Sequence, residues 1–96
     1  MHSLDSIKSS LSSKKEQLYK DYSIKSLAIF GSYSRGEENK SSDLDMLVEF
    51  SETIGIRFID LAEELEKILA CKVDLVSKKA IKESYYKSII NDLIYV

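Results

Sequence analysis

The chain has 96 residues, the length of one small domain. Its composition, 44% hydrophobic and 31% charged, excludes fibrous and collagen-like proteins and indicates one globular domain over residues 1–96. Fourteen Lys and Arg against sixteen Asp and Glu give a net charge of −2, so direct nucleic-acid binding is not expected. With one Cys and one His, the chain also lacks the ligand cluster of a zinc site.

No apolar run reaches the length of about 18 residues that a membrane span needs, and the first thirty residues contain no hydrophobic stretch typical of a signal peptide. We therefore expect a cytoplasmic protein with no membrane association.

Three elements are predicted in the first half of the chain. Apolar residues at helical spacing from Leu4 to Tyr22 predict an amphipathic helix, which packing must hold because its many serines lower helix propensity. The segment Ile24–Phe30 ends in an unbroken apolar run and predicts a central strand covered on both faces. Residues 31–42 are polar and predict a loop with room for one helical turn.

The second half alternates strands and helices. Period-two alternation predicts strands over Asp43–Phe50 and Lys72–Ser77, and helical spacing predicts a helix over residues 57–69 between them. A last helix is predicted over about Ile81–Tyr95. This order indicates an α/β (α+β) fold in which a short mixed sheet of at least three strands is flanked by helices.

Three carboxylates stand out as candidate metal ligands. Asp43 and Asp45 lie two positions apart on a predicted strand, so both point from one face, about 6–7 Å apart along the strand axis. The two carboxylates repel each other unless a hard cation such as Mg²⁺ lies between them. Asp74 could add a third oxygen ligand if its strand lies beside theirs, and three carboxylates suit a two-metal site. Taken singly, each acid is more often a solvated edge residue.

The loop after the first strand has the features of a phosphate-binding turn. Gly31 permits close backbone approach, Ser32 offers a hydroxyl, and Arg35 could grip a pair of triphosphate oxygens. Alone, the Gly-Ser pair is a weak signal and Arg35 is more often part of a loop salt bridge. Chance seldom gives the combined spacing of Gly31-Ser32, ten residues, Asp43-Leu44-Asp45 and a third Asp in so short a chain.

This combination resembles the signature of the DNA polymerase β-like nucleotidyltransferase superfamily. The strings GSYSRG, SSDLDMLVEF and KVDLVS are similar to those of the minimal nucleotidyltransferases, the MNT or MntA-type antitoxins that pair with HEPN-domain toxins. The resemblance covers nearly the whole chain and implies the polymerase β-like palm fold. It further implies that Asp43 and Asp45 share two Mg²⁺ ions, that Asp74 is the third acid, and that Gly31 and Ser32 cradle the triphosphate. Arg35 carries over less firmly.

The reaction that the resemblance implies is transfer of AMP from ATP to a hydroxyl, a tyrosine of the cognate HEPN toxin, with release of pyrophosphate. Two metal ions would activate the acceptor hydroxyl and neutralise the leaving pyrophosphate. Two other readings stay open: an antitoxin of the same fold that acts by binding and occlusion alone, and a nucleotidyltransferase for a small molecule such as an antibiotic. The absence of a second domain disfavours the small molecule, which needs a concave pocket.

The C-terminal segment carries more apolar residues than a half-buried helix requires. On the predicted last helix, Tyr85, Tyr86, Ile90 and Ile94 belong to or broaden one apolar stripe, which predicts a surface for the partner protein. The alternative, a helix that simply packs on the sheet, explains the stripe equally well.

Overall fold

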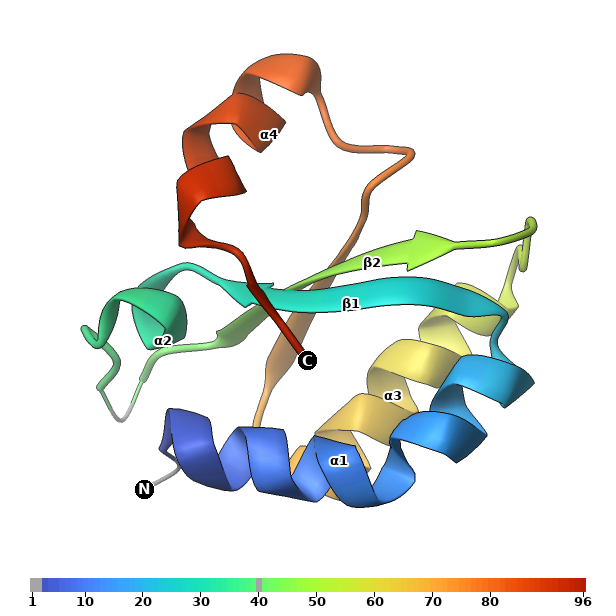
Figure 1. Cartoon of the computed structure of the whole chain (residues 1–96), viewed down its shortest axis with the longest axis horizontal. Helices are drawn as coiled ribbons and strands as arrows, with labels where there is room; N and C mark the ends of the chain where they lie inside the picture. The colour runs from blue at the N-terminus through green and yellow to red at the C-terminus, as the bar shows by residue number, and fades with distance from the viewer. Residues whose placement is uncertain (1–2, 40) are drawn as a thin grey trace.

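Four strands form one mixed sheet in the computed structural model, which describes residues 3–39 and 41–96 (Figure 1). The strands are β1 (Ile24–Phe30), β2 (Leu44–Phe50), β3 (Val73–Ser77) and β4 (Ile94–Tyr95), and their order in the sheet is β3-β2-β1-β4. β1 runs antiparallel to both β2 and β4, whereas β2 and β3 are parallel. The crossover between the two parallel strands contains α3 (Arg57–Leu69), as a parallel connection requires. The fold class predicted from the sequence, a short mixed sheet flanked by helices, is therefore confirmed.

α1 (Leu4–Asp21) and α3 cover one face of the sheet (Figure 1). The main core lies between these layers and includes residues that are 3% exposed or less, among them Ile7, Leu18, Ile29, Met46, Leu61 and Leu65. Ser3 caps α1 in a reciprocal capping box, in which the Ser6 N–H donates to its hydroxyl at 3.1 Å. Packing and this cap together stabilise α1, because its many serines give it a low intrinsic helix propensity.

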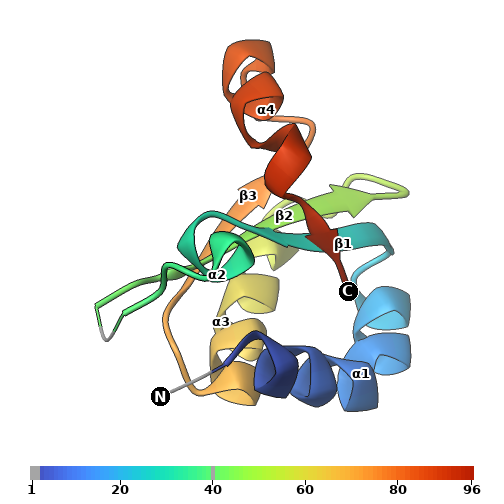
Figure 2. The same cartoon turned by 60° about the vertical axis from the view of Figure 1, so that its left-hand side comes forward.

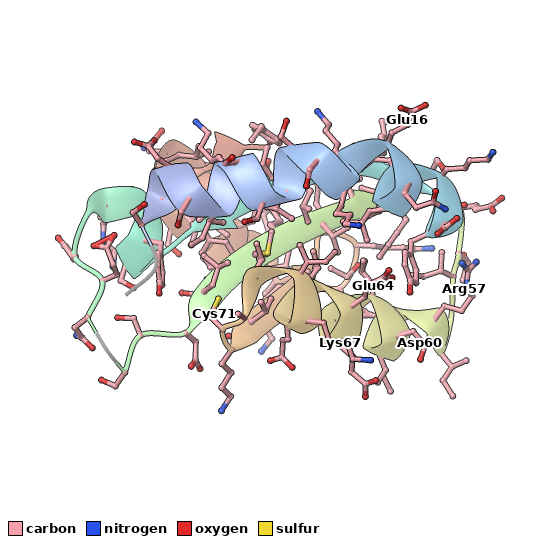
Figure 3. The ribbon with its side chains drawn as sticks, turned by 90° about the horizontal axis from the view of Figure 1, so that it is seen from below. Glu16, Arg57, Asp60, Glu64, Lys67 and Cys71 are labelled. Atoms are coloured by element: carbon pink, nitrogen blue, oxygen red, sulfur yellow. The ribbon has the colours of Figure 1, made fainter. Side chains whose placement is uncertain are left out.

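The two helices are joined near the end of α1. The Arg57 guanidinium lies 5.1 Å from the centre of the Tyr22 ring and donates a hydrogen bond to the Asp21 carbonyl. A hydrogen bond with Glu64, followed by burial, raises the pKa of Tyr22 to about 12. Figure 3 shows Arg57 and Glu64 toward one end of α3 and Cys71 beyond its other end. These contacts fix the angle between α1 and α3 far from the candidate acids.

The other face of the sheet carries α4 (Glu83–Ile89) (Figure 2). Phe30, Leu47 and Ile89 form a small second core there, with Tyr86 and Leu93 among its partly buried neighbours. Because alternate residues of a strand point to opposite faces, this is also the face that Asp45 and Asp74 share.

The long C-terminal helix predicted over Ile81–Tyr95 is wrong. α4 ends at Ile89, a 3₁₀ turn spans Ile90–Asp92, and the chain then becomes β4. β4 pairs with the edge of β1, where the Val96 N–H donates to the Leu27 carbonyl at 2.9 Å. Pairing an exposed strand edge satisfies backbone groups that a longer helix would leave bare, and the apolar periodicity could not reveal it.

Within the described residues, none of the helices combines the length and apolar character that a membrane span requires.

Candidate functional site

Two of the three predicted acids face each other across neighbouring strands. Asp45 of β2 and Asp74 of β3 are partners in the parallel register, so their side chains leave the same face at the same level. Asp45 is half-buried and Asp74 is exposed. Asp43 is exposed and lies just before β2, which begins at Leu44, one residue later than the predicted strand.

The Asp45 carboxyl has a raised pKa and, among the described residues, no basic ion-pair partner. Burial raises its pKa to about 6, assisted by the charge of Asp74, a hydrogen bond with Asp74 and the charge of Asp43, while Arg35 acts weakly in the other direction. Among the described residues, no lysine or arginine forms an ion pair with Asp45 or Asp74. Farther along β2, by contrast, Glu49 has a lysine contact at 3.5 Å.

Gly31 lies directly against the Asp45 carboxylate. It directly follows β1 and precedes the helical turn of residues 32–35, with φ +75°, a conformation that side chains disfavour, and a Cβ built on it would stand 2.2 Å from Asp45 Oδ2. Glycine is therefore required twice over at this position, by its backbone conformation and by the carboxylate next to it. The sequence predicts that another group comes close to the backbone at Gly31. In the structure that group is the Asp45 carboxylate.

Ser32 begins the single turn of α2 (Ser32–Arg35), which Gly36 closes in the left-handed conformation. Arg35, at the end of this turn, is held by two carboxylates. Its Nε donates to Glu37 Oε1 at 3.0 Å and its Nη1 to Asp92 Oδ2 at 3.1 Å. The salt-bridge alternative for Arg35 is thus present in the structure, next to the acids.

Asp92 is a residue that sequence reasoning missed. Besides its ion pair with Arg35, its carbonyl accepts a hydrogen bond from the Ser34 hydroxyl. It thereby ties the C-terminal segment to the loop that follows β1. Its only local signal is the polar Asn91-Asp92 pair that interrupts an apolar run, and that pair says nothing about a contact 57 residues away.

The donor set fits a hard cation in its chemistry. Carboxylate oxygens of Asp45 and Asp74, which repel each other and have no basic partner in the described part of the chain, are the ligands that Mg²⁺ prefers. Within that part, however, no group of three His, Cys, Asp or Glu side chains is close enough to hold an ion. Asp43 thus acts on Asp45 through its charge, without the three acids closing into one cluster.

Two hollows lie away from the three acids. A hollow of about 720 Å³ is found at the other end of β2 and β3, lined by residues 49–55, Phe58 and residues 77–79. A smaller one lies between α1, β1 and Val96. Neither includes Asp43, Asp45 or Asp74, so neither offers a small molecule an enclosed place beside the acids.

The residues predicted for partner binding separate into three environments. Tyr85 and Ile90 are exposed, at 47% and 46%. Tyr86 packs against the second core, and Ile94 is paired with Ile29 in the sheet. The continuous helical stripe through all four is therefore wrong, because the helix ends before Ile90.

A family model described as a nucleotidyltransferase domain matches residues 8–96. The chain belongs to this family. It is 49% identical over 100 residues to a candidate protein adenylyltransferase of Methanocaldococcus jannaschii, and the alignment covers 100% of both proteins. It is 38% identical over 97 residues to the protein adenylyltransferase MntA of Thermococcus cleftensis, covering 100% of this chain and 98% of that protein.

A solved structure of a toxin-antitoxin with AMP-PNP has the same fold as this nucleotidyltransferase. The TM-score is 0.72 at 27% identity, and the match covers 86% of this chain and 69% of that one. The resemblance to minimal nucleotidyltransferases that the GSYSRG and SSDLDMLVEF strings indicate is therefore confirmed, as are the fold class and the nucleotidyltransferase activity.

Proposed function

We propose that this nucleotidyltransferase is an antitoxin that transfers AMP from ATP to a tyrosine hydroxyl of a cognate HEPN-family toxin. The observation that carries the proposal is the in-register pair of Asp45 and Asp74 beside Gly31. The relatives support it, since those with similarity over the full length are named protein adenylyltransferases. A structural neighbour is a toxin-antitoxin with AMP-PNP.

Asp45 and Asp74 would hold Mg²⁺ together with Asp43, which would have to turn toward them because the three acids do not form one cluster among the described residues. When bound, magnesium would lower the pKa of the acceptor hydroxyl and offset the negative charge on the phosphates. The raised pKa of Asp45 supports this assignment, because a bound cation offsets the burial and the repulsion that keep its proton bound.

The other residues of the site would position the nucleotide. Gly31, which has no Cβ and so leaves room for the Asp45 carboxylate, would offer its backbone to a phosphate, and the Ser32 hydroxyl at the start of the following turn would offer a donor. Arg35 is 44% exposed and could exchange one of its carboxylate partners for a phosphate oxygen. In the transfer, the acceptor oxygen bonds to the α-phosphorus, the bond from that phosphorus to the bridging oxygen breaks, and Asp74 takes up the acceptor proton.

A protein acceptor fits this site better than a small molecule. Asp43 and Asp74 are exposed, and the two hollows described above do not reach the acids. A small hydroxylated ligand needs a concave pocket with several fixed polar groups, whereas a protein brings its own docking surface. Tyr85 and Ile90, both exposed, are the candidates for that contact.

Intact-mass spectrometry of the partner tests the proposal. The cognate HEPN-family toxin, purified unmodified, is incubated with the nucleotidyltransferase, ATP and Mg²⁺. We expect the mass of the toxin to rise by whole adenylyl units that map to tyrosine, and Asp43→Asn to abolish the increase. Glu63→Gln, an exposed change on α3, is the control and should transfer normally.

The same experiment separates the alternatives. A stable complex with unchanged toxin mass, combined with protection of cells by Asp43→Asn, would favour occlusion without catalysis. An unmodified toxin together with transfer to small hydroxylated compounds would instead favour the antibiotic-type reaction.

A further inference from the structure

Tyr85 lies over the acidic face from the opposite layer. It belongs to α4, and its ring meets Phe30 edge-on, with 6.3 Å between ring centres and 79° between planes. Phe30 is the register partner of Asp45 on β1, and Asp45 is the register partner of Asp74 on β3. Phe30, Asp45 and Asp74 therefore lie side by side across three strands. Tyr85 contacts the Phe30 end of this row.

The Tyr85 side chain is partly exposed, and the charges of both acids act on its hydroxyl. The residue is 47% exposed. Partial burial and then the charges of Asp45 and Asp74 raise the pKa of its hydroxyl. Both acids thus act on one tyrosine oxygen from the neighbouring layer.

Four of the other five tyrosines are engaged elsewhere, and the fifth, Tyr95, is exposed on β4. The Tyr19 hydroxyl donates to the Val96 carbonyl at 3.0 Å, and Tyr22 is bonded to Glu64 on the far side of the sheet. Tyr33 is buried under the loop after β1. Tyr86, next to Tyr85, turns its ring to Lys78 at 5.6 Å and packs into the second core.

We propose that Tyr85 is a self-modification site, an acceptor in the same chain to which the nucleotidyltransferase transfers AMP when no partner is bound. The inference rests on the proposed function, because it uses the same acids, the same nucleoside triphosphate and the same class of acceptor hydroxyl. The ring contact with Phe30 places the Tyr85 side chain next to the row of strand residues that includes Asp45 and Asp74, without any second molecule.

The step balances with ATP as its only co-substrate. The Tyr85 oxygen bonds to the α-phosphorus, and the bond from that phosphorus to the bridging oxygen breaks. Pyrophosphate leaves, and the hydroxyl proton passes to an acid of the site and then to water. The product is a phosphodiester between tyrosine and adenosine on the exposed side of α4.

The test uses the full chain alone, incubated with ATP and Mg²⁺ and followed by intact mass and peptide mapping. We expect one adenylyl unit on Tyr85, with a first-order rate that does not depend on protein concentration. Tyr85→Phe should remove the gain, whereas the matched control Tyr86→Phe should retain it. In a mixture with wild type, a mass-tagged Asp45→Asn chain should stay unmodified, because its acceptor belongs to an inactive site.

Two results would overturn the inference while leaving the proposed function standing: no self-modification by a preparation that adenylylates its toxin, or a mass gain that persists in Tyr85→Phe. Modification of the tagged Asp45→Asn chain would show transfer between molecules and overturn the same-chain geometry. A preparation that modifies neither itself nor the toxin would overturn both proposals.

Discussion

Replacing Asp45 with Asn should stabilise the metal-free protein while abolishing transfer. The pKa of Asp45 is about 6 in the folded chain, against about 3.9 for a free side chain. The folded state therefore binds the proton more tightly, so stability is greatest below pH 4 and falls as pH rises from about 4 to about 6. Above this window the full cost of the charged carboxylate is present, and Asn removes it.

The magnitude follows from the shift. Two pKa units correspond to about 3 kcal/mol, and solvent screening of a partly exposed group reduces this to about 1–2 kcal/mol. In a domain of this size, each kcal/mol shifts Tm by roughly 4–8 °C. We therefore expect Asp45→Asn to melt about 5–10 °C above wild type at pH 7.5 in a chelator, and to melt with wild type at pH 4.

Thermal unfolding followed by circular dichroism at the two pH values measures the difference, with Glu63→Gln as the exposed control. Added Mg²⁺ should raise the Tm of wild type at pH 7.5 and leave Asp45→Asn unchanged, since only the native site binds the ion. A lower Tm for Asp45→Asn at pH 7.5, or an equal gain at both pH values, would refute the argument from repulsion.

Three further changes test the rest of the site and the core. Gly31→Ala should lose transfer and lower Tm, because its Cβ would meet Asp45 Oδ2 at 2.2 Å; an active, stable variant would contradict the packing. Arg35→Gln should raise the KM for ATP while Asp92→Asn, which breaks the same ion pair but keeps the guanidinium, should not; equal KM values would leave Arg35 a purely structural role. Leu65→Ala, in the fully buried core, should cost about 2–5 kcal/mol in urea unfolding with little change in kcat.

Local pattern was sufficient for most of the fold. Period-two alternation identified β2, and helical spacing gave α3 with the predicted residues 57–69. Both follow from which side of an element faces the core, a property that sequence carries residue by residue. The failure at Ile90–Val96 has the opposite origin: β4 exists because the edge of β1 needs a partner, and helical spacing cannot register a pairing with residues 28 and 29.

The candidate site likewise combines features set by local sequence with features set by long-range contacts. The spacing of Gly31, Asp43 and Asp45 is local, and it was visible in the sequence. That Asp74 stands level with Asp45 depends on the register of two parallel strands. The Arg35–Asp92 ion pair depends on where the C-terminal segment returns. Sequence reasoning could list such residues, but only the fold decides which of them meet.

The C-terminal segment connects recognition with chemistry. α4 lies on the face that bears Asp45 and Asp74, and it exposes Tyr85 there. A partner that docks on α4 and Ile90 would bring its acceptor hydroxyl to the place that Tyr85 occupies in the free chain. Partner and Tyr85 would then compete for one position, so binding of the partner should itself suppress modification of Tyr85.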